Sequence, residues 1–149
     1  MQLIRNNSYT IYNGTELELT KNPDGKFMLI YRGKNPPDNS FIKANGCEDV
    51  FNKIVTESDI HNAFSVVTFA LYKNYKFQVD RFENNKFRIT TSDNEALGKL
   101  NLHFVDRGWY DTWVSPEEIE RMWEERKPSG LNFPFPHDLA ETQEISFKS

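Results

Sequence analysis

Alternation of apolar and polar residues around tight-turn sequences constrains this chain more than any other feature. The pair Asn13-Gly14 separates two short stretches in which such residues alternate. Both central residues of a tight hairpin turn need a positive φ, which asparagine and glycine adopt at low cost. A second turn sequence, Asn22-Pro23-Asp24-Gly25, precedes a third alternating stretch over 26–32. The pattern predicts a three-stranded antiparallel meander over residues 8–32.

The same pattern returns sixty residues later in the chain. When residues 8–31 are compared with residues 68–91, the apolar positions coincide and the turn sequences fall at the same places. A slip of one residue would turn every side chain to the other face of its strand, so agreement in register is informative even where identity is low. We therefore expect an internal repeat, approximately over residues 8–56 and 64–127. The alternative is that two unrelated amphipathic meanders share the pattern.

The strongest helix signal lies at residues 115–127. Ser115 suits an N-cap, Pro116 suits the first helical position, and the acidic residues that follow favour the positive end of a helix. The apolar residues of this stretch would share one helical face: Ile119, Met122 and Trp123. The spacing predicts a helix that ends before the proline at position 128.

A matching helix is expected at residues 47–56, where Val50, Phe51 and Ile54 fall at helical spacing. At an offset of sixty-nine residues, Val50 coincides with Ile119, which would place the two helices at equivalent points of the repeat. The extra residues of the second half correspond roughly to 93–101, which we expect to form a short helix capped at Ser92 or Asp93.

These elements predict an α+β fold. A meander of three short strands cannot cover both faces of its sheet, so two such units must pack together or pair edge to edge. We expect antiparallel β-meanders in two similar β-meander-plus-helix halves, with the helices packed on the sheet. The 149 residues suffice for a single domain, 1–149, and the prolines of residues 128–149 predict an extended C-terminal tail.

Composition indicates the cellular compartment of the protein. The chain has one cysteine, so no disulfide can form within it, which indicates a reducing compartment. The N-terminal residues lack the apolar stretch of a signal peptide, and no segment has the apolar length of a membrane span. We expect a cytoplasmic protein without membrane contact.

The charge of the chain is unevenly distributed. Residues 1–91 have a balance of +2 and residues 92–149 a balance of −6, which give the net charge of −4. Phosphate binding needs a basic footprint, so the acidic second part argues against nucleic acid. It fits a cationic partner, although a solvated acidic surface would give the same pattern.

No arrangement of residues predicts catalysis. His61, His103 and His137 lie on separate elements, and Cys47 is followed by two acidic residues that disfavour its thiolate. The chain has no CxxC, HExxH or glycine-rich phosphate motif. We therefore expect no metal, no cofactor and no enzyme, although a deep pocket that joined a histidine to a carboxylate would favour a small hydrolase.

Aromatic and acidic residues of the second half form the candidate binding site. Trp and Tyr often anchor interfaces because they bury a large area with few rotamers. The expected helix would align its glutamates in an acidic stripe that could meet Lys or Arg. The predicted partner-binding residues are Trp109, Tyr110, Asp111, Glu117, Glu120 and Glu124. The alternatives are tryptophans that hold the helix on the sheet and a stripe that is merely solvated.

Three stretches carry a resemblance to a known family: ALYKNYKFQVDR, TSDNEALGKL and VDRGWYDTWVSPEEIERMWEERKP. With the compact, acidic, aromatic-rich composition, they make residues 63–135 similar to small bacterial immunity proteins encoded beside secreted polymorphic toxins. The resemblance implies tight stoichiometric binding that neutralises a toxin domain. Many such toxins are nucleases with basic clefts, so it also implies a basic partner. The alternative is a structural or regulatory interaction module, such as a homodimer formed through an unpaired edge strand.

Overall fold

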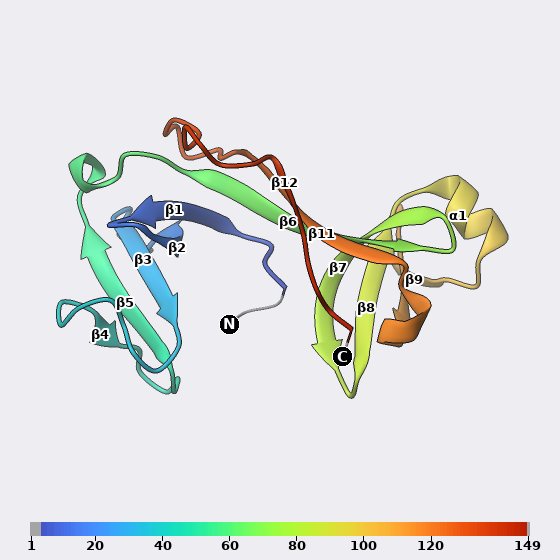
Figure 1. Ribbon diagram of the computed structural model, residues 1–149. Helices are drawn as coiled ribbons and strands as arrows, with labels where there is room; N and C mark the ends of the chain where they lie inside the picture. Colours follow the sequence, from blue (N-terminus) through green and yellow to red (C-terminus); the bar gives the residue numbers. More distant parts are fainter. Residues whose placement is uncertain (1–3, 149) are drawn as a thin grey trace. The chain divides into compact units, whose positions relative to one another are not determined.

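The computed structural model describes residues 4–148, and they form mostly antiparallel β-structure (Figure 1). In this part of the chain the only α-helix is α1 (Asn94–Lys99), and two turns of 3₁₀-helix accompany it, η1 (Glu57–Asp59) and η2 (Pro116–Glu118). The predicted α+β fold, with two helices packed on the sheet, is therefore wrong. No helix among the described residues is long and apolar enough to cross a membrane.

The chain forms two compact units. Unit 1 consists of residues 7–66 and 126–140, and unit 2 of residues 67–125 together with 4–6 and 141–148. Strands β6 (Phe64–Tyr72) and β11 (Arg121–Pro128) contain the positions at which the chain passes from one unit to the other.

Unit 1 is built on an antiparallel sheet with the strand order β4-β5-β3-β2-β1-β6. Its further strands are β1 (Ser8–Tyr12), β2 (Thr15–Lys21), β3 (Phe27–Arg32), β4 (Ile42–Lys43) and β5 (Val50–Val55). The turn between β1 and β2 has a positive φ at Asn13 and Gly14, as the hairpin prediction requires. The predicted meander over residues 8–32 is present as β1, β2 and β3.

Unit 2 is built on the strand order β6-β7-β8-β10-β9, and β11 pairs with β12. Its further strands are β7 (Tyr75–Glu83), β8 (Lys86–Thr91), β9 (His103–Asp106), β10 (Trp109–Val114) and β12 (Thr142–Glu144). Helix α1 is capped by Asp93, whose carboxylate accepts hydrogen bonds from the backbone N–H groups of Glu95 and Ala96. The short helix predicted near residues 93–101 is thus confirmed.

The helices predicted at 47–56 and 115–127 are wrong. Residues 50–55 are strand β5, and the second stretch divides into the single turn η2 and strand β11. Three consecutive residues of β11 are buried, from Met122 to Glu124. A strand covered on both faces loses its alternating pattern, and its apolar residues then fall at a spacing that also fits a helix.

The order of elements repeats in the two units. In unit 1 the meander of β1, β2 and β3 is followed by strand β5 and the turn η1. In unit 2 the meander of β6, β7 and β8 is followed by the corresponding strand β10 and turn η2. Each 3₁₀ turn carries a capping box, Thr56 with Asp59 in η1 and Ser115 with Glu118 in η2. These boxes are fifty-nine residues apart, so the expected offset of sixty-nine in this part of the repeat is wrong. The origin of the repeat by duplication stays a prediction.

Each unit has its own apolar core on one face of its sheet. In unit 1 the core includes Leu17, Leu19 and Leu29, and in unit 2 it includes Phe77, Phe87 and Ile89. The C-terminal residues contribute to these cores through three aromatic contacts: Phe133 on Phe27, Phe135 on Phe64 and Phe147 on Phe87.

Candidate interaction surface

The sheet of unit 2 has a second face that carries charged and aromatic side chains. Neighbouring residues of a strand point to opposite faces, so the strands that bury Phe87 and Val114 turn Arg88 and Trp113 to the other side. A register shift between Val79 and Arg81 adds Asp80 to the same side. We call this surface the outer face of unit 2. Its charged and aromatic members are Asp80, Arg81, Glu83, Lys86, Arg88, His103, Trp109, Asp111 and Trp113.

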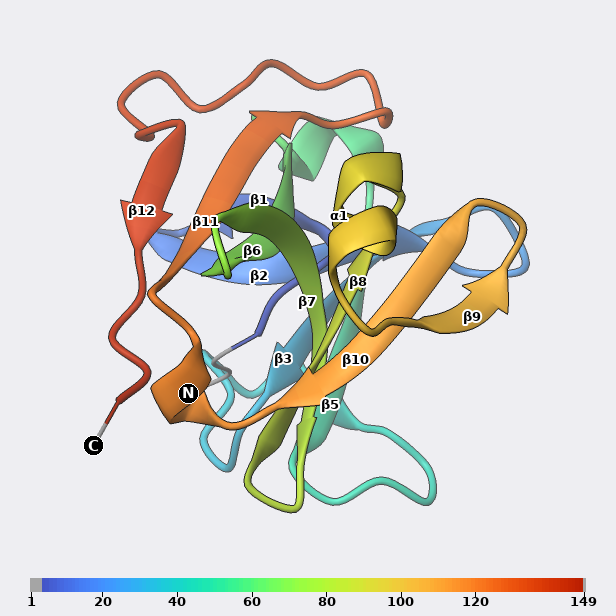
Figure 2. The ribbon, with the colours of Figure 1, turned by 90° about the vertical axis from the view of Figure 1, so that its right-hand side faces the viewer.

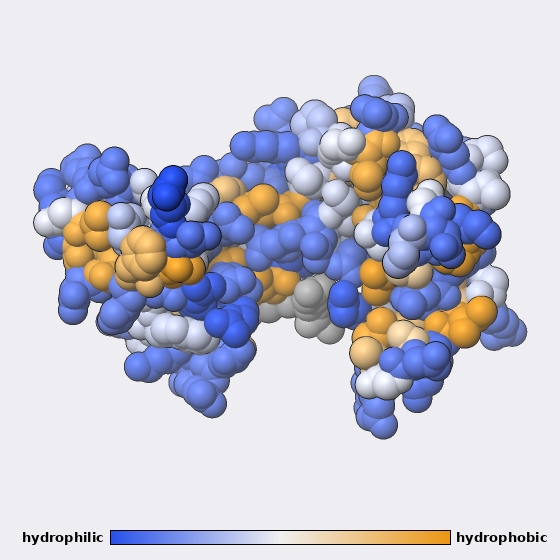
Figure 3. All heavy atoms as spheres, turned by 180° about the vertical axis from the view of Figure 1, so that it is seen from behind, coloured by the Kyte–Doolittle hydropathy of each residue, from blue (hydrophilic) through white to orange (hydrophobic). Residues whose placement is uncertain are grey.

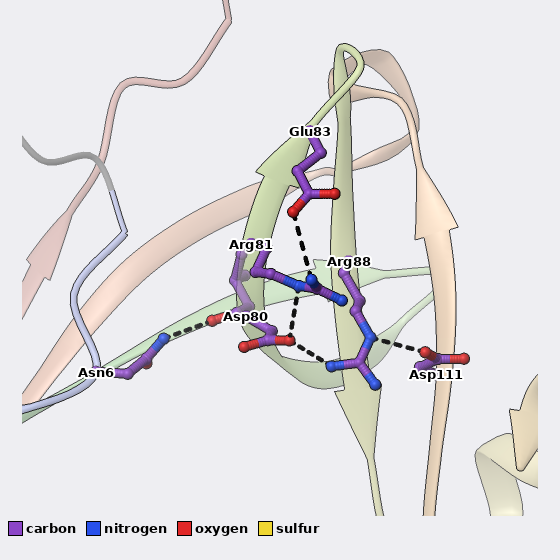
Figure 4. A network of polar contacts seen from close by, with 7 residues as sticks. Asn6, Asp80, Arg81, Glu83, Arg88 and Asp111 are labelled. Carbon is purple, nitrogen blue, oxygen red and sulfur yellow. Dashed lines mark hydrogen bonds and ion pairs between the residues drawn. The ribbon is translucent and has the colours of Figure 1, made fainter. Parts of the chain in front are cut away.

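Arg88 lies at the centre of the outer face, between two carboxylates (Figure 4). Its Nε donates to Asp111 Oδ2 at 2.8 Å, and its Nη1 donates to Asp80. Burial alone would lower the pKa of the guanidinium, but the hydrogen bonds to Asp80 and Asp111 outweigh it and hold that pKa above its ordinary value. Arg88 therefore stays charged and fixes the positions of both carboxylates.

Arg81 extends this network. Its Nη1 lies 3.3 Å from Glu83 Oε1 and its Nε lies 3.5 Å from Asp80 Oδ2. The guanidinium also lies over the ring of Trp113, 5.4 Å from the ring centroid, which is a cation–π distance. Asp111 is 4.0 Å from His103 Nδ1. The outer face is thus an ordered set of charges around an indole ring.

The hairpin of β9 and β10 borders the outer face and exposes large apolar side chains. Strand β9 is the last strand of the sheet, as Figure 2 shows. The exposed fractions are 71% for Phe104, 42% for Val105 and 44% for Trp109. Phe104 contacts Tyr110 edge to face, with 6.1 Å between ring centroids. Patches of hydrophobic residues reach the surface between hydrophilic ones in the space-filling view (Figure 3).

The six predicted partner-binding residues do not form one surface in the structure. Trp109 and Asp111 belong to the outer face, and Tyr110 lies on the other side of the hairpin against Phe104. Glu117 and Glu120 are exposed, but without the predicted helix they form no stripe with Glu124. Glu124 is buried, and both its oxygens accept hydrogen bonds from Arg5.

Sequence reasoning missed several members of this surface. Asp80, Arg81 and Arg88 lie in strands that were predicted, and their charges alternate with buried apolar residues, which is the signal of an exposed strand face. That Arg88 meets Asp111 depends on the pairing of β8 with β10, two strands separated in the chain by α1 and β9. Local patterns do not encode such a pairing.

The described residues support a catalytic site less well than they support an interaction surface. His61, His137 and Asp138 line one surface groove of unit 1, of about 510 Å³, but the lining contains no hydroxyl, thiol or amine nucleophile. Across residues 4–148, no group of three His, Cys, Asp or Glu side chains is arranged to hold a metal ion. Cys47 is exposed.

Comparison with known proteins gives one match. A family model described as "Uncharacterised conserved protein UCP033725" matches residues 4–130. No curated protein and no solved structure matches the chain. The description of the family names no activity.

Proposed function

The chain belongs to the family described as "Uncharacterised conserved protein UCP033725", and we propose that it acts by binding another protein. The contact surface would be the β9–β10 hairpin together with the outer face of unit 2. The observation that carries the proposal is the exposure of Phe104 and Val105 on β9, the strand at the end of the sheet, and of Trp109 on the neighbouring strand β10.

Exposed apolar residues on an edge strand need a reason. An edge strand presents unpaired backbone groups, and proteins usually protect such edges with charged residues or a covering segment. Burying a large apolar side chain contributes about 1.5–3 kcal/mol, so Phe104 and Trp109 would be strong anchors in an interface. Half-buried arginine and tryptophan, as in Arg88 and Trp113, are also typical of interface centres.

The charges on and beside the outer face are of both signs. The carboxylates of Asp80, Glu83, Asp106 and Asp111 lie among the cations of Arg81, Lys86, Arg88 and Arg107. Complementary charge would speed association and select the partner. The resemblance to immunity proteins implies one specific partner, a toxin domain with a basic cleft. On this proposal the protein acts in the cytoplasm and catalyses no reaction.

The proposal is tested by affinity capture from the cells that produce the protein. Tagged wild-type protein and the variant Phe104→Ser/Trp109→Ser are compared, and proteins recovered in near-equal amount are identified by mass spectrometry. The matched control is Ile42→Ser, because Ile42 is 73% exposed on β4, the end strand of the unit 1 sheet. We expect a partner that the double variant loses and the control retains.

Two outcomes would contradict the proposal. Retention of the partner by the double variant would remove the hairpin from the interface. A wild-type protein that sediments as a stable dimer without a partner, and becomes monomeric in the double variant, would assign the hairpin to self-association.

A further inference from the structure

A second candidate site lies in unit 1, at the point where β1 and β2 separate. The pairing of these strands ends at Tyr9 and Glu18, whereas β2 continues to Lys21. An open cavity of about 380 Å³ lies along the part of β2 that pairs with β3 but no longer with β1. That volume falls in the range of small-molecule sites.

A buried carboxylate forms the base of the cavity. The Glu18 side chain is only 8% exposed. Its Oε1 accepts a hydrogen bond from Asn7 Nδ2, and its Oε2 accepts from Arg32 Nε at 3.1 Å. Arg32 Nη2 lies 3.0 Å from the same oxygen. A buried charge must be paired, so Glu18 holds the guanidinium of Arg32 in one position.

Arg32 keeps donors available after this pairing. An arginine has five N–H donors, and Glu18 occupies one on Nε and one on Nη2. The Arg32 side chain is 46% exposed and lines the cavity. Its Nη1–Nη2 edge has the fork geometry that binds a carboxylate through two parallel hydrogen bonds.

The remaining walls define the rest of the ligand. Ile30 and Leu131 supply apolar surface, and Ser8 and Thr20 supply hydroxyl groups. Lys21 adds a second positive charge to the lining. With Arg32 and Glu18 the lining has a net charge of +1, which favours an anion.

The repeat shows that this arrangement is not required by the scaffold. Sixty residues after Glu18 and Arg32, unit 2 has Gln78 and Ser92. The strand position of Glu18 therefore accepts an uncharged residue in the same succession of elements. Of these two equivalent positions, only the one in unit 1 carries a carboxylate that orients an arginine, which favours a role in binding.

We propose that this cavity binds a small molecule with one carboxylate and a compact apolar body. The carboxylate would meet the Nη1–Nη2 edge of Arg32, and the apolar body would lie against Ile30 and Leu131. The site is independent of the hairpin surface, because all the residues of the cavity belong to unit 1.

Benzoate is a suitable probe, and benzamide is its uncharged counterpart. Titration of the full chain is followed through the arginine Nε–H signals in NMR spectra and through the melting temperature. We expect benzoate to shift the Arg32 signal and raise the melting temperature, and benzamide to do neither. Arg32→Lys keeps a cation beside Glu18 but lacks the fork, so it should bind benzoate about tenfold more weakly, a loss of roughly 1.4 kcal/mol.

The matched control is Arg81→Lys, since the Arg81 side chain is 51% exposed and ion-paired in unit 2. This variant should bind benzoate like the wild type. Leu131→Phe, which narrows the cavity without touching the ion pair, should weaken binding as well. Equal affinity of the wild type and Arg32→Lys, or shifts confined to arginines other than Arg32, would overturn the assignment. The Phe104→Ser/Trp109→Ser variant should bind benzoate normally, so failure of one proposal leaves the other intact.

Discussion

At the scale of single residues, Glu124 shows how this protein uses a charge in its interior. Its two oxygens accept hydrogen bonds from Arg5 Nε and Nη2 at 2.8 and 2.9 Å, and the two side chains are 8% and 16% exposed. Removal of the carboxylate charge would weaken both of these hydrogen bonds to a largely buried guanidinium. We expect Glu124→Gln to lower the free energy of unfolding by about 3 kcal/mol, measured by urea denaturation.

The control for this prediction is Glu117→Gln, because Glu117 is exposed in η2. An exposed substitution of this kind should change stability by less than about 0.5 kcal/mol. Similar small effects of both substitutions would mean that Glu124 is solvated, as the acidic stripe predicted from the sequence required.

At the scale of elements, the turns between strands were predictable from the sequence, but the strand β11 was mistaken for a helix. The meander of β1, β2 and β3 follows from alternation around residues with positive φ, which are properties of a few neighbouring residues. Strand β11 buries Glu124 and Arg126, and charged residues in a sequence indicate an exposed face unless their partners are known. The partner of Glu124 is 119 residues away, and no local pattern contains it.

The 3₁₀ turn η1 carries a prediction on pH. The carboxylate of Asp59 accepts one hydrogen bond from the backbone N–H of Thr56 and one from the hydroxyl of Thr56. The backbone bond in the first place, and the hydroxyl bond in the second, hold the pKa of the carboxyl below the ordinary value of 3.8. A carboxyl whose folded pKa is depressed stabilises the fold above its unfolded pKa, and this contribution is lost as the pH falls through the folded pKa. We expect Asp59→Asn to be less sensitive than the wild type to acid below about pH 4.

Urea midpoints measured across this pH range would check the prediction. Glu57→Gln, an exposed neighbour that makes the same change of net charge, is the control and should follow the wild-type curve. Parallel curves for the wild type and Asp59→Asn would show that ionisation of Asp59 contributes nothing to stability in this pH range.

At the scale of the whole molecule, the candidate surface was predictable only in part. Trp109 and Asp111 were selected from composition alone, because tryptophan beside charge is typical of interfaces. Their neighbours Arg81 and Arg88 come from β7 and β8, so the outer face of unit 2 exists only through the pairing of β8 with β10. The cavity beside Arg32 likewise needs Leu131, which is far away in the sequence.

The same dependence on distant segments yields a prediction on folding. Unit 1 needs residues 126–140, because Phe133 packs on Phe27 at 5.3 Å and Ala63 N–H donates to Pro134 O at 3.0 Å. A fragment of residues 7–66 exposes this part of the core. We expect it to lack a cooperative urea transition in circular dichroism, and a fragment that joins 7–66 to 126–140 through a flexible linker to regain one.

The joined fragment also distinguishes two kinds of molecule. If it unfolds cooperatively, unit 1 is a domain whose chain is merely interrupted by unit 2. If neither fragment folds, each unit depends on the strands β6 and β11 that continue into the other, and the chain is the single domain predicted from its length. A folded fragment 7–66 would contradict the contribution assigned to Phe133 and Pro134, because their contacts would then be unnecessary for the core of unit 1.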